Sequence, residues 1–473
     1  MTAGGRWALS VTAFRVRAVD AADLERRART SSGCIPSTLV ARLLELGHER
    51  EVERQAGRGE WFCALAWAHL LGERRQYEWA LDVLAPYVAT GWWPAVRGRA
   101  ELLEAWGRTD EAIVLCRSRA QGGDRLFVEF FARLLARHGR GEEAFAMLCP
   151  GIEDWFLAAA LVDVAATAGL DEQAAALLEA RIGAAAPACD DLDCGRMRLE
   201  PFNAVELLAD VRERQGRIDE AIALMGRRDG TSVNGRDALA DLLARHDRIG
   251  ELRAYAATEY HGHAAQRLAE VLEERGDVEG AIAAYRTFAD ESDGLWHVAV
   301  PLTELLVRHG RADEAIEVMR GLAGRPGGAE DWIINTLCDL YAGQGRAQDA
   351  LVYLDDLKER RGVEDWDFFR MRLPLMARCG LTDEAVERAR VHPEGDTWYA
   401  AWSLAELLCE AGRTEEALTV LERHPGHLVP FRAELLVELG RVDEALRLLQ
   451  QPPQPDPADD PWNAAAHPDE PPF

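Results

Sequence analysis

The chain repeats one short pattern along most of its length, a glycine that is followed five residues later by an alanine. Ten glycines have this partner: Gly107, Gly139, Gly169, Gly216, Gly276, Gly310, Gly345, Gly380, Gly412 and Gly440. Glycine adopts left-handed backbone angles without steric penalty, so we predict that each of these glycines ends a helix. From Gly276 to Gly412 they lie 34, 35, 35 and 32 residues apart. This regular interval predicts stacked helix-turn-helix repeats rather than separate globular domains.

The residues on either side of the glycine predict a first helix before it and a second helix after it. Before Gly412, Leu404 and Leu408 fall on one face of a helix. After it, Glu415 and Glu416 occupy the start of the next helix, where the positive end of the helix dipole favours acidic residues. The alanine after the turn is small, so we expect the two helices of a repeat to approach each other closely.

The pattern divides the chain into five parts, which are listed here by residue number. We predict an irregular basic N-terminal segment at 1–35, a first block of repeats at 36–183, an inserted loop or hinge at 184–202, a second block at 203–450, and a disordered, proline-rich acidic tail at 451–473. Gly47 and Gly72 mark two degenerate turns in the first block. Asp247 stands where a turn glycine is expected, and aspartate tolerates the left-handed conformation.

The pattern L-A-x-x-[LY]-x-x-x-G-R-x-x-E-A resembles the tetratricopeptide repeat family over residues 36–450, or about thirteen repeats. The resemblance implies an all-α fold, a right-handed α-solenoid of helix-turn-helix repeats. It also implies a concave groove lined by first helices that holds a peptide segment or a protein surface. On this basis we expect a non-enzymatic scaffold for protein-protein interaction.

The net charge of -27 disfavours a nucleic-acid ligand and favours a basic partner. Nine cysteines, an odd number scattered mostly singly, predict reduced thiols in the cytoplasm. The apolar run from Trp7 to Phe14 is followed by Arg15 and Arg17, and the longer run at 155–170 contains Asp163. We therefore predict neither a signal peptide nor a membrane span.

One position of the first helix, six residues before the turn residue, is acidic in nine of the eleven repeats from Gly107 onward. We predict that eight of these carboxylates bind a partner: Asp163, Asp210, Asp241, Glu270, Glu304, Asp339, Glu406 and Glu434. The position lies nearly opposite the leucine stripe, so it is not part of the core. By resemblance to the family it should face the groove, and a row of like charges would be relieved by a cationic segment. The alternative is an ordinary solvated helix face.

Tryptophan recurs near the start of the first helix, at Trp93, Trp155, Trp296, Trp366 and Trp398, with Trp332 one place later. A row of aromatic anchors for a ligand is one interpretation. Packing against the preceding repeat is the interpretation that we favour, because large aromatic side chains usually serve burial.

The sequence shows no nucleophile elbow, phosphate loop or nucleotide fingerprint, so we predict no catalytic residues and no cofactor. Cys189 and Cys194 form the one cysteine pair with neighbouring acids, but a structural zinc site needs a second pair, and we predict no metal.

Three other functions are weaker. The second-ranked hypothesis is a peptide- or ligand-sensing regulatory module that acts through another chain, with 184–201 as its hinge. The segment 331–362 also resembles a pentatricopeptide repeat, a family that reads single-stranded RNA. Such readers carry a small polar residue nine positions before the glycine, which fits at Thr336 and Ser403 but not at the corresponding position of eight other repeats. RNA binding and a metal-dependent enzyme are therefore the least favoured.

Overall fold

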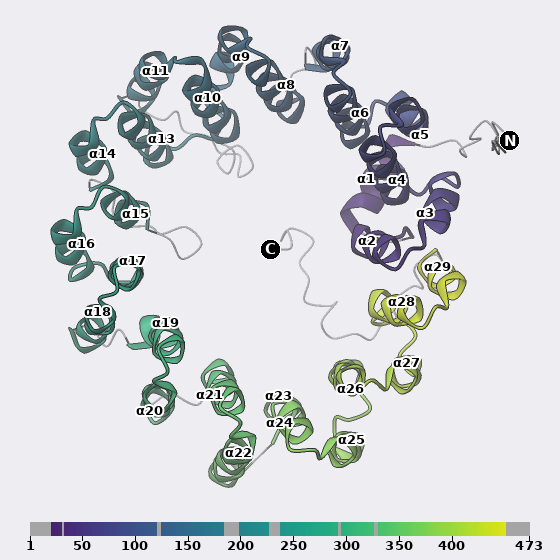
Figure 1. The fold of residues 1–473 in the computed structure, drawn as a ribbon, viewed down its shortest axis with the longest axis vertical. Helices are drawn as coiled ribbons and strands as arrows, with labels where there is room; N and C mark the ends of the chain where they lie inside the picture. The colour runs from purple at the N-terminus through teal and green to yellow at the C-terminus, as the bar shows by residue number, and fades with distance from the viewer. Residues whose placement is uncertain are drawn as a thin grey trace, which may run out of the picture. The chain divides into compact units, whose positions relative to one another are not determined.

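The computed structural model of the protein describes residues 20–30, 33–120, 124–183, 198–226, 237–291, 295–325, 330–362 and 364–450. Within these ranges the chain consists of α-helices joined by short turns (Figure 1). It divides into two compact units, which are described separately. Unit 1 comprises residues 1–134 and 413–473, and unit 2 comprises residues 135–412.

Unit 1 contains the first and the last helices of the chain. They are α1 (Ala21–Thr30), α2 (Ser37–Glu45), α3 (Glu49–Ala56), α4 (Trp61–Glu73), α5 (Tyr77–Ala89), α6 (Trp93–Ala105), α7 (Thr109–Ala120), most of α8 (Arg125–Arg137), α27 (Thr414–Leu421), α28 (Val429–Glu438) and α29 (Val442–Leu449). Segments far apart in the sequence meet in this unit. The Gln450 side chain donates a hydrogen bond of 2.9 Å to Gln55, and Arg54 forms an ion pair of 2.7 Å with Asp443.

Unit 2 is a series of helix pairs. Its helices are α9 (Gly141–Leu148), η1 (Cys149–Gly151), α10 (Trp155–Ala168), α11 (Asp171–Gly183), α13 (Pro201–Arg214), α14 (Ile218–Met225), α15 (Ala238–Arg245), α16 (Ile249–Ala256), α17 (His263–Glu274), α18 (Val278–Glu291), α19 (Leu295–Arg308), α20 (Ala312–Ala323), α21 (Asp331–Gly343), α22 (Ala347–Arg361), α23 (Trp366–Arg370), α24 (Arg372–Arg378), α25 (Thr382–Val391) and α26 (Trp398–Glu410). Within this unit the first helices α13, α15, α17, α19 and α21 form an inner row, and their partners α14, α16, α18, α20 and α22 form an outer row (Figure 1). The predicted all-α solenoid of helix-turn-helix repeats is confirmed.

The turn residues have the predicted left-handed backbone. All ten repeat glycines have a positive φ, between 69° at Gly169 and 82° at Gly107, and Asp247 has a φ of 59°. The turn after α19 shows the hydrogen bonding that this conformation permits. There the backbone N–H of Arg311 donates to the carbonyl of Leu306 at 2.8 Å, which satisfies one of the free carbonyls at the helix end.

The alanine five residues after each glycine lies fully inside the repeat. All ten alanines have no exposed surface: Ala112, Ala144, Ala174, Ala221, Ala281, Ala315, Ala350, Ala385, Ala417 and Ala445 are each 0% exposed. A larger side chain at this position would push the second helix away from its neighbours, because protein interiors are close-packed. The predicted close approach of the helices is therefore confirmed.

Ion pairs reinforce the turns in a way that the sequence pattern did not specify. The arginine after the turn glycine pairs with the acid three residues further on, as Arg311 does with Glu314 at 2.6 Å. The same arginine reaches the second helix of the preceding repeat, where it pairs with Glu279 at 2.6 Å. Arg346 repeats both contacts, with Asp349 at 2.7 Å and with Asp313 at 3.0 Å. Exposed pairs contribute only about 0–1 kcal/mol each, so they fix register more than stability.

Two sequence-based expectations for the N-terminal part of the chain are wrong. The segment 1–35 was expected to be irregular, but residues 21–30 form α1, which is anchored by Leu24 at 5% exposure. Ion pairs from Asp23 to Arg26 and Arg27 favour the helix, at 2.6 and 2.7 Å. The second error concerns a turn, because Gly72 lies inside α4.

The left-handed residue of that second turn is Arg75, with a φ of 60°, whereas Gly47 has the predicted positive φ of 80°. Gly72 instead allows a close approach between helices. A Cβ atom there would come within 2.9 Å of the Leu102 side chain on α6.

The predicted hinge and the predicted tail lie mostly outside the described residues, which omit 184–197 and 451–473. The end of the inserted loop is described. Arg198 forms an isolated antiparallel bridge with Asp154, and the buried Leu199 donates its backbone N–H to the carbonyl of Glu153 at 2.7 Å.

The turn conformation leads to a stability prediction. At Gly310, φ is 73° and a Cβ atom would meet nothing within 4 Å, so Gly310→Ala should destabilise the protein by about 1–2 kcal/mol through the backbone alone. Gly321 also has open space but lies inside α20 without a positive φ, so Gly321→Ala should be neutral or stabilising by up to about 1 kcal/mol. Chemical denaturation of both variants measures the difference. Equal effects would contradict the left-handed assignment.

Candidate functional site

The eight predicted partner-binding carboxylates all lie outside the buried core. Five are exposed, namely Asp163, Asp210, Glu304, Asp339 and Glu406, and three are half-buried, namely Asp241, Glu270 and Glu434. The structure does not draw them into one cluster. Asp210 and Asp241 line one cavity together.

That cavity, which we call the acidic cavity, has a volume of about 170 Å³ and lies between α13 and α15 in unit 2. Its charged lining consists of Glu206, Asp210 and Glu213 from α13 and Asp241 and Arg245 from α15. The spacing explains the arrangement. Residues four and three positions apart lie on one face of a helix, so α13 directs three carboxylates toward the cavity and α15 directs one carboxylate and one arginine.

The single arginine of the acidic cavity is already engaged. Arg245 binds Glu213 through two hydrogen bonds, of 2.9 and 2.8 Å, and His246 contacts the same carboxylate at 2.7 Å. The pKa of Glu213 is accordingly lowered, chiefly by the hydrogen bond from Arg245. Asp241 pairs at 3.0 Å with Arg267, which belongs to the next first helix, α17. Two of the carboxylates that line the cavity, Glu213 and Asp241, are thus each paired with an arginine.

Among the carboxylates of the cavity, Asp210 has the most strongly shifted pKa. Desolvation raises its pKa to about 6, and repulsion from Glu206 and Glu213 adds to the increase. The residue nevertheless has exposed surface. Both observations fit a side chain at the mouth of a cavity, where water reaches one edge while the walls displace the rest of its hydration. A carboxylate held in this state is stabilised by any cation that enters the cavity.

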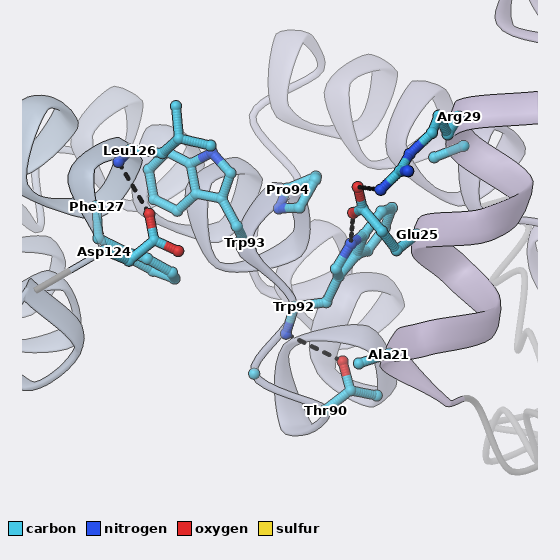
Figure 2. A pocket seen from close by; sticks show the side chains of 12 residues that line it. Ala21, Glu25, Arg29, Thr90, Trp92, Trp93, Pro94, Asp124, Leu126 and Phe127 are labelled. Atoms are coloured by element: carbon cyan, nitrogen blue, oxygen red, sulfur yellow. Dashed lines mark hydrogen bonds and ion pairs between the residues drawn. The ribbon is translucent and has the colours of Figure 1, made fainter. Parts of the chain in front are cut away.

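A larger hollow, which we call the aromatic cleft, lies in unit 1 and was not predicted from the sequence. It has a volume of about 710 Å³ and is formed by α1, by the turn that joins α5 to α6, and by the start of α8 (Figure 2). Its lining residues are Ala21, Glu25, Ala28, Arg29, Thr90, Gly91, Trp92, Trp93, Pro94, Asp124, Leu126 and Phe127. Because α1 was expected to be irregular, the sequence offered no second wall for this cleft.

Hydrogen bonds and ring contacts hold the walls of the aromatic cleft in place. On one side, the indole N–H of Trp92 donates to Glu25 at 2.8 Å, and Arg29 lies 3.6 Å from the same carboxylate (Figure 2). On the other side, Trp93 packs edge-to-face on Phe127, with 4.2 Å between ring centroids. The cleft thus has an apolar floor with carboxylates near its edges.

The recurring tryptophans do not share one role. Trp366 is buried at 3% exposure, as the packing interpretation requires. Trp155 and Trp332 are 45% and 38% exposed, so packing does not account for their whole surface. Trp93 is half-buried and contributes to the aromatic cleft. The same sequence position therefore serves burial in one repeat and lines a surface hollow in another.

Within the described ranges, no group of three or more histidine, cysteine or acidic side chains is arranged to hold a metal ion. Cys189 and Cys194, the pair considered from the sequence, lie outside those ranges. No helix of the described ranges is long and apolar enough to cross a membrane.

No protein-family model matches the chain, and no curated protein matches its sequence. One similar solved structure is that of Naa15/Naa10 bound to HypK-THB, with 13% identity over 91% of this chain and 78% of the other and a TM-score of 0.38. A tetratricopeptide repeat protein from Parabacteroides merdae has 15% identity, covering 60% of this chain and 93% of the other, with a TM-score of 0.27.

Yeast Tom70 has 11% identity, covering 88% of this chain and 94% of the other, with a TM-score of 0.28. Scores this low add nothing to the solenoid fold, which rests on the helices and turns described above.

The perturbed carboxylate predicts a pH dependence of stability. A native pKa of about 6, above the ordinary value of 3.8, means that the native state binds the proton more tightly than the unfolded state. The contribution of Asp210 to stability is therefore most favourable at acidic pH and declines as the pH rises from about 4 to above 6. Relative to the wild type, Asp210→Asn should gain thermal stability across this window. If the difference in melting temperature between Asp210→Asn and the wild type stayed constant from pH 4 to 7, the raised pKa of Asp210 would be contradicted.

Proposed function

We propose that the protein is a non-enzymatic, cytoplasmic scaffold for protein-protein interaction, and that the acidic position of its first helices binds a basic or amphipathic segment of a partner. The observation that supports this most is the acidic cavity. Four carboxylates, from Glu206, Asp210, Glu213 and Asp241, line it against one arginine that is already paired. A guanidinium group from a partner would bring positive charge to these carboxylates, together with planar donors whose hydrogen bonds they can accept.

Internal ion pairs narrow the proposal. Arg267 contacts both Asp241 and Glu270 at 3.0 Å, so these two carboxylates are partly neutralised within the chain. Asp339 and Glu406 accept hydrogen bonds from neutral groups, the Asn335 amide at 3.2 Å and the Trp402 indole at 2.6 Å, and these bonds bring no positive charge to them. The attraction for a cation is therefore uneven along unit 2.

Asp210 is the strongest candidate for direct contact with the partner. The Asp210 carboxylate is already partly dehydrated in the free protein. A cation that binds to it therefore gains Coulomb energy without the full cost of removing water from a hydrated carboxylate. Binding should stabilise the ionised form and lower the pKa of Asp210. A terminal carboxylate, which some tetratricopeptide repeat proteins hold, would meet like charge here and is an unsuitable ligand.

The test replaces four carboxylates by neutral amides, in the variant Asp210→Asn, Asp241→Asn, Glu270→Gln, Glu304→Gln. A fluorescent peptide of alternating arginine and leucine serves as the probe, and one of alternating glutamate and leucine as the reversed-charge probe. Because an exposed ion pair contributes roughly 0.2–1 kcal/mol, we expect the variant to bind the arginine peptide about tenfold more weakly. Its affinity should also depend less on salt concentration.

A matched control separates position from net charge. The control variant also removes four carboxylates, all exposed and all on second helices of unit 2: Glu142→Gln on α9, Glu172→Gln on α11, Glu317→Gln on α20 and Asp356→Asn on α22. We expect this variant to retain most of the affinity for the arginine peptide. Equal losses in the two variants would show that only net charge matters, and unchanged binding in the first variant would refute the site.

A further inference from the structure

The aromatic cleft is independent of the acidic position, since it is built from α1 and from the starts of α6 and α8, and none of the eight predicted carboxylates lines it. We propose that it is a docking site for the chain's own residues 1–19, which precede the first described residue, Asp20. The occupant is inferred from the place where the segment joins the cleft, from charge complementarity and from the apolar character of both partners.

The segment joins the described chain at the edge of the cleft. Ala21, the first residue of α1, lines the cleft itself. Seven residues of extended chain span at most about 25 Å, so Phe14 can reach the cleft floor without any movement of α1. A short tether also gives the segment an effective concentration in the millimolar range, so a contact that would be weak between separate molecules is populated within one chain.

The cleft offers apolar surface near its centre and, near its edges, two carboxylates against one arginine, Arg29. Leu126 is 40% exposed, and it lies beside Trp93 and Pro94 in the lining (Figure 2). Asp124 and Glu25 stand on opposite walls. Asp124 accepts the backbone N–H of Leu126 at 2.9 Å, which caps α8 and leaves its carboxylate facing the cleft (Figure 2).

Residues 1–19 have the complementary composition. They contain Arg6, Arg15 and Arg17 and no acidic residue. Between the arginines lie apolar side chains, among them Trp7 and Phe14. Aromatic groups on an aromatic floor with guanidinium groups near the flanking carboxylates would bury apolar area and form charge-assisted hydrogen bonds together.

The segment 451–473 is the rival occupant from the same chain. Proline-rich segments do bind aromatic grooves, and this one follows Gln450, which contacts α3 in the same unit. Its charged residues, however, are all acidic, and they would meet Glu25 and Asp124 with like charge. Charge complementarity therefore favours residues 1–19.

Limited proteolysis of the full-length protein tests the proposal. Trypsin cleaves after Arg15 and Arg17, and mass spectrometry measures the rate at which the N-terminal fragment is released. Two substitutions close the cleft to the segment, Leu126→Asp at the floor and Ala28→Arg on the α1 wall. Because cleavage of a reversibly docked segment follows the population of its open form, we expect both variants to release the fragment at least about fivefold faster than the wild type.

The controls make each outcome decisive. Leu381→Asp changes a leucine of matched exposure, 38%, in unit 2, and should leave the rate unchanged. If Leu126→Asp impairs folding, as circular dichroism would reveal, Ala28→Arg decides alone, since arginine is well tolerated in a helix. Wild-type rates in a folded cleft variant would overturn the proposal, as would an equal acceleration by Leu381→Asp.

Two further measurements distinguish other occupants. A protease that cleaves after acidic residues reports on residues 451–473 in the same variants. Faster cleavage of this segment, with no change in the cleavage rate of residues 1–19, would assign the cleft to residues 451–473 and overturn the proposal. The four-amide variant of the acidic position should cleave like the wild type. Acceleration in that variant would mean that residues 1–19 dock on the acidic first helices instead of the cleft.

Discussion

The repeat structure depends on the contact between the two helices of each repeat at the alanine that follows the turn. A solenoid has no central core, so apolar surface is buried only where adjacent helices meet. The ten alanines with no exposed surface show how close these helices lie. The left-handed glycine directs the second helix back along the first, and the small side chain lets it pack there. Leucine stripes such as Leu268 and Leu272 complete the burial on the first helix.

The acidic side chains of the chain fall into two groups, those that form ion pairs between helices and those at the acidic position of the first helices. Acids near the turns pair with arginines of their own and the neighbouring repeat, as Glu314 and Glu279 do with Arg311. Acids near the ends of first helices behave similarly, since Glu273 of α17 binds Arg308 of α19 at 2.7 Å. These pairs account for part of the negative charge. The acidic position differs because Asp210 and its neighbours in the acidic cavity outnumber the nearby arginines.

The sequence predicted the repeating architecture because the turn and its packing are local. The glycine, the alanine and the leucine stripe lie within about two helices of one another, and short-range patterns describe them well. The cross-repeat ion pairs were not predicted, because they join residues about thirty positions apart whose proximity follows only from the stacking. The aromatic cleft was missed for a similar reason. Its walls come from three helices, and α1 is too short and too polar to stand out by pattern, with Leu24 as its main anchor.

The same limit applies to the acidic position. Spacing showed that these carboxylates lie off the core face, but it did not distinguish Asp241, which Arg267 neutralises in part, from Asp210, which shares a cavity with other carboxylates. That distinction depends on which side chains of adjacent first helices face each other. Asp210 is consequently a better-supported candidate for contact with a cationic partner than the eight carboxylates taken together.

Proton release on binding tests the central proposal most directly. Calorimetric titration of the alternating arginine-leucine peptide at pH 6, in buffers of different ionisation enthalpy, gives the number of protons exchanged. If a cation enters the acidic cavity, the pKa of Asp210 falls from about 6 and protons are released, and Asp210→Asn abolishes the release. Binding with no proton exchange, with proton uptake, or with a release that Asp210→Asn leaves unchanged would contradict the proposed site.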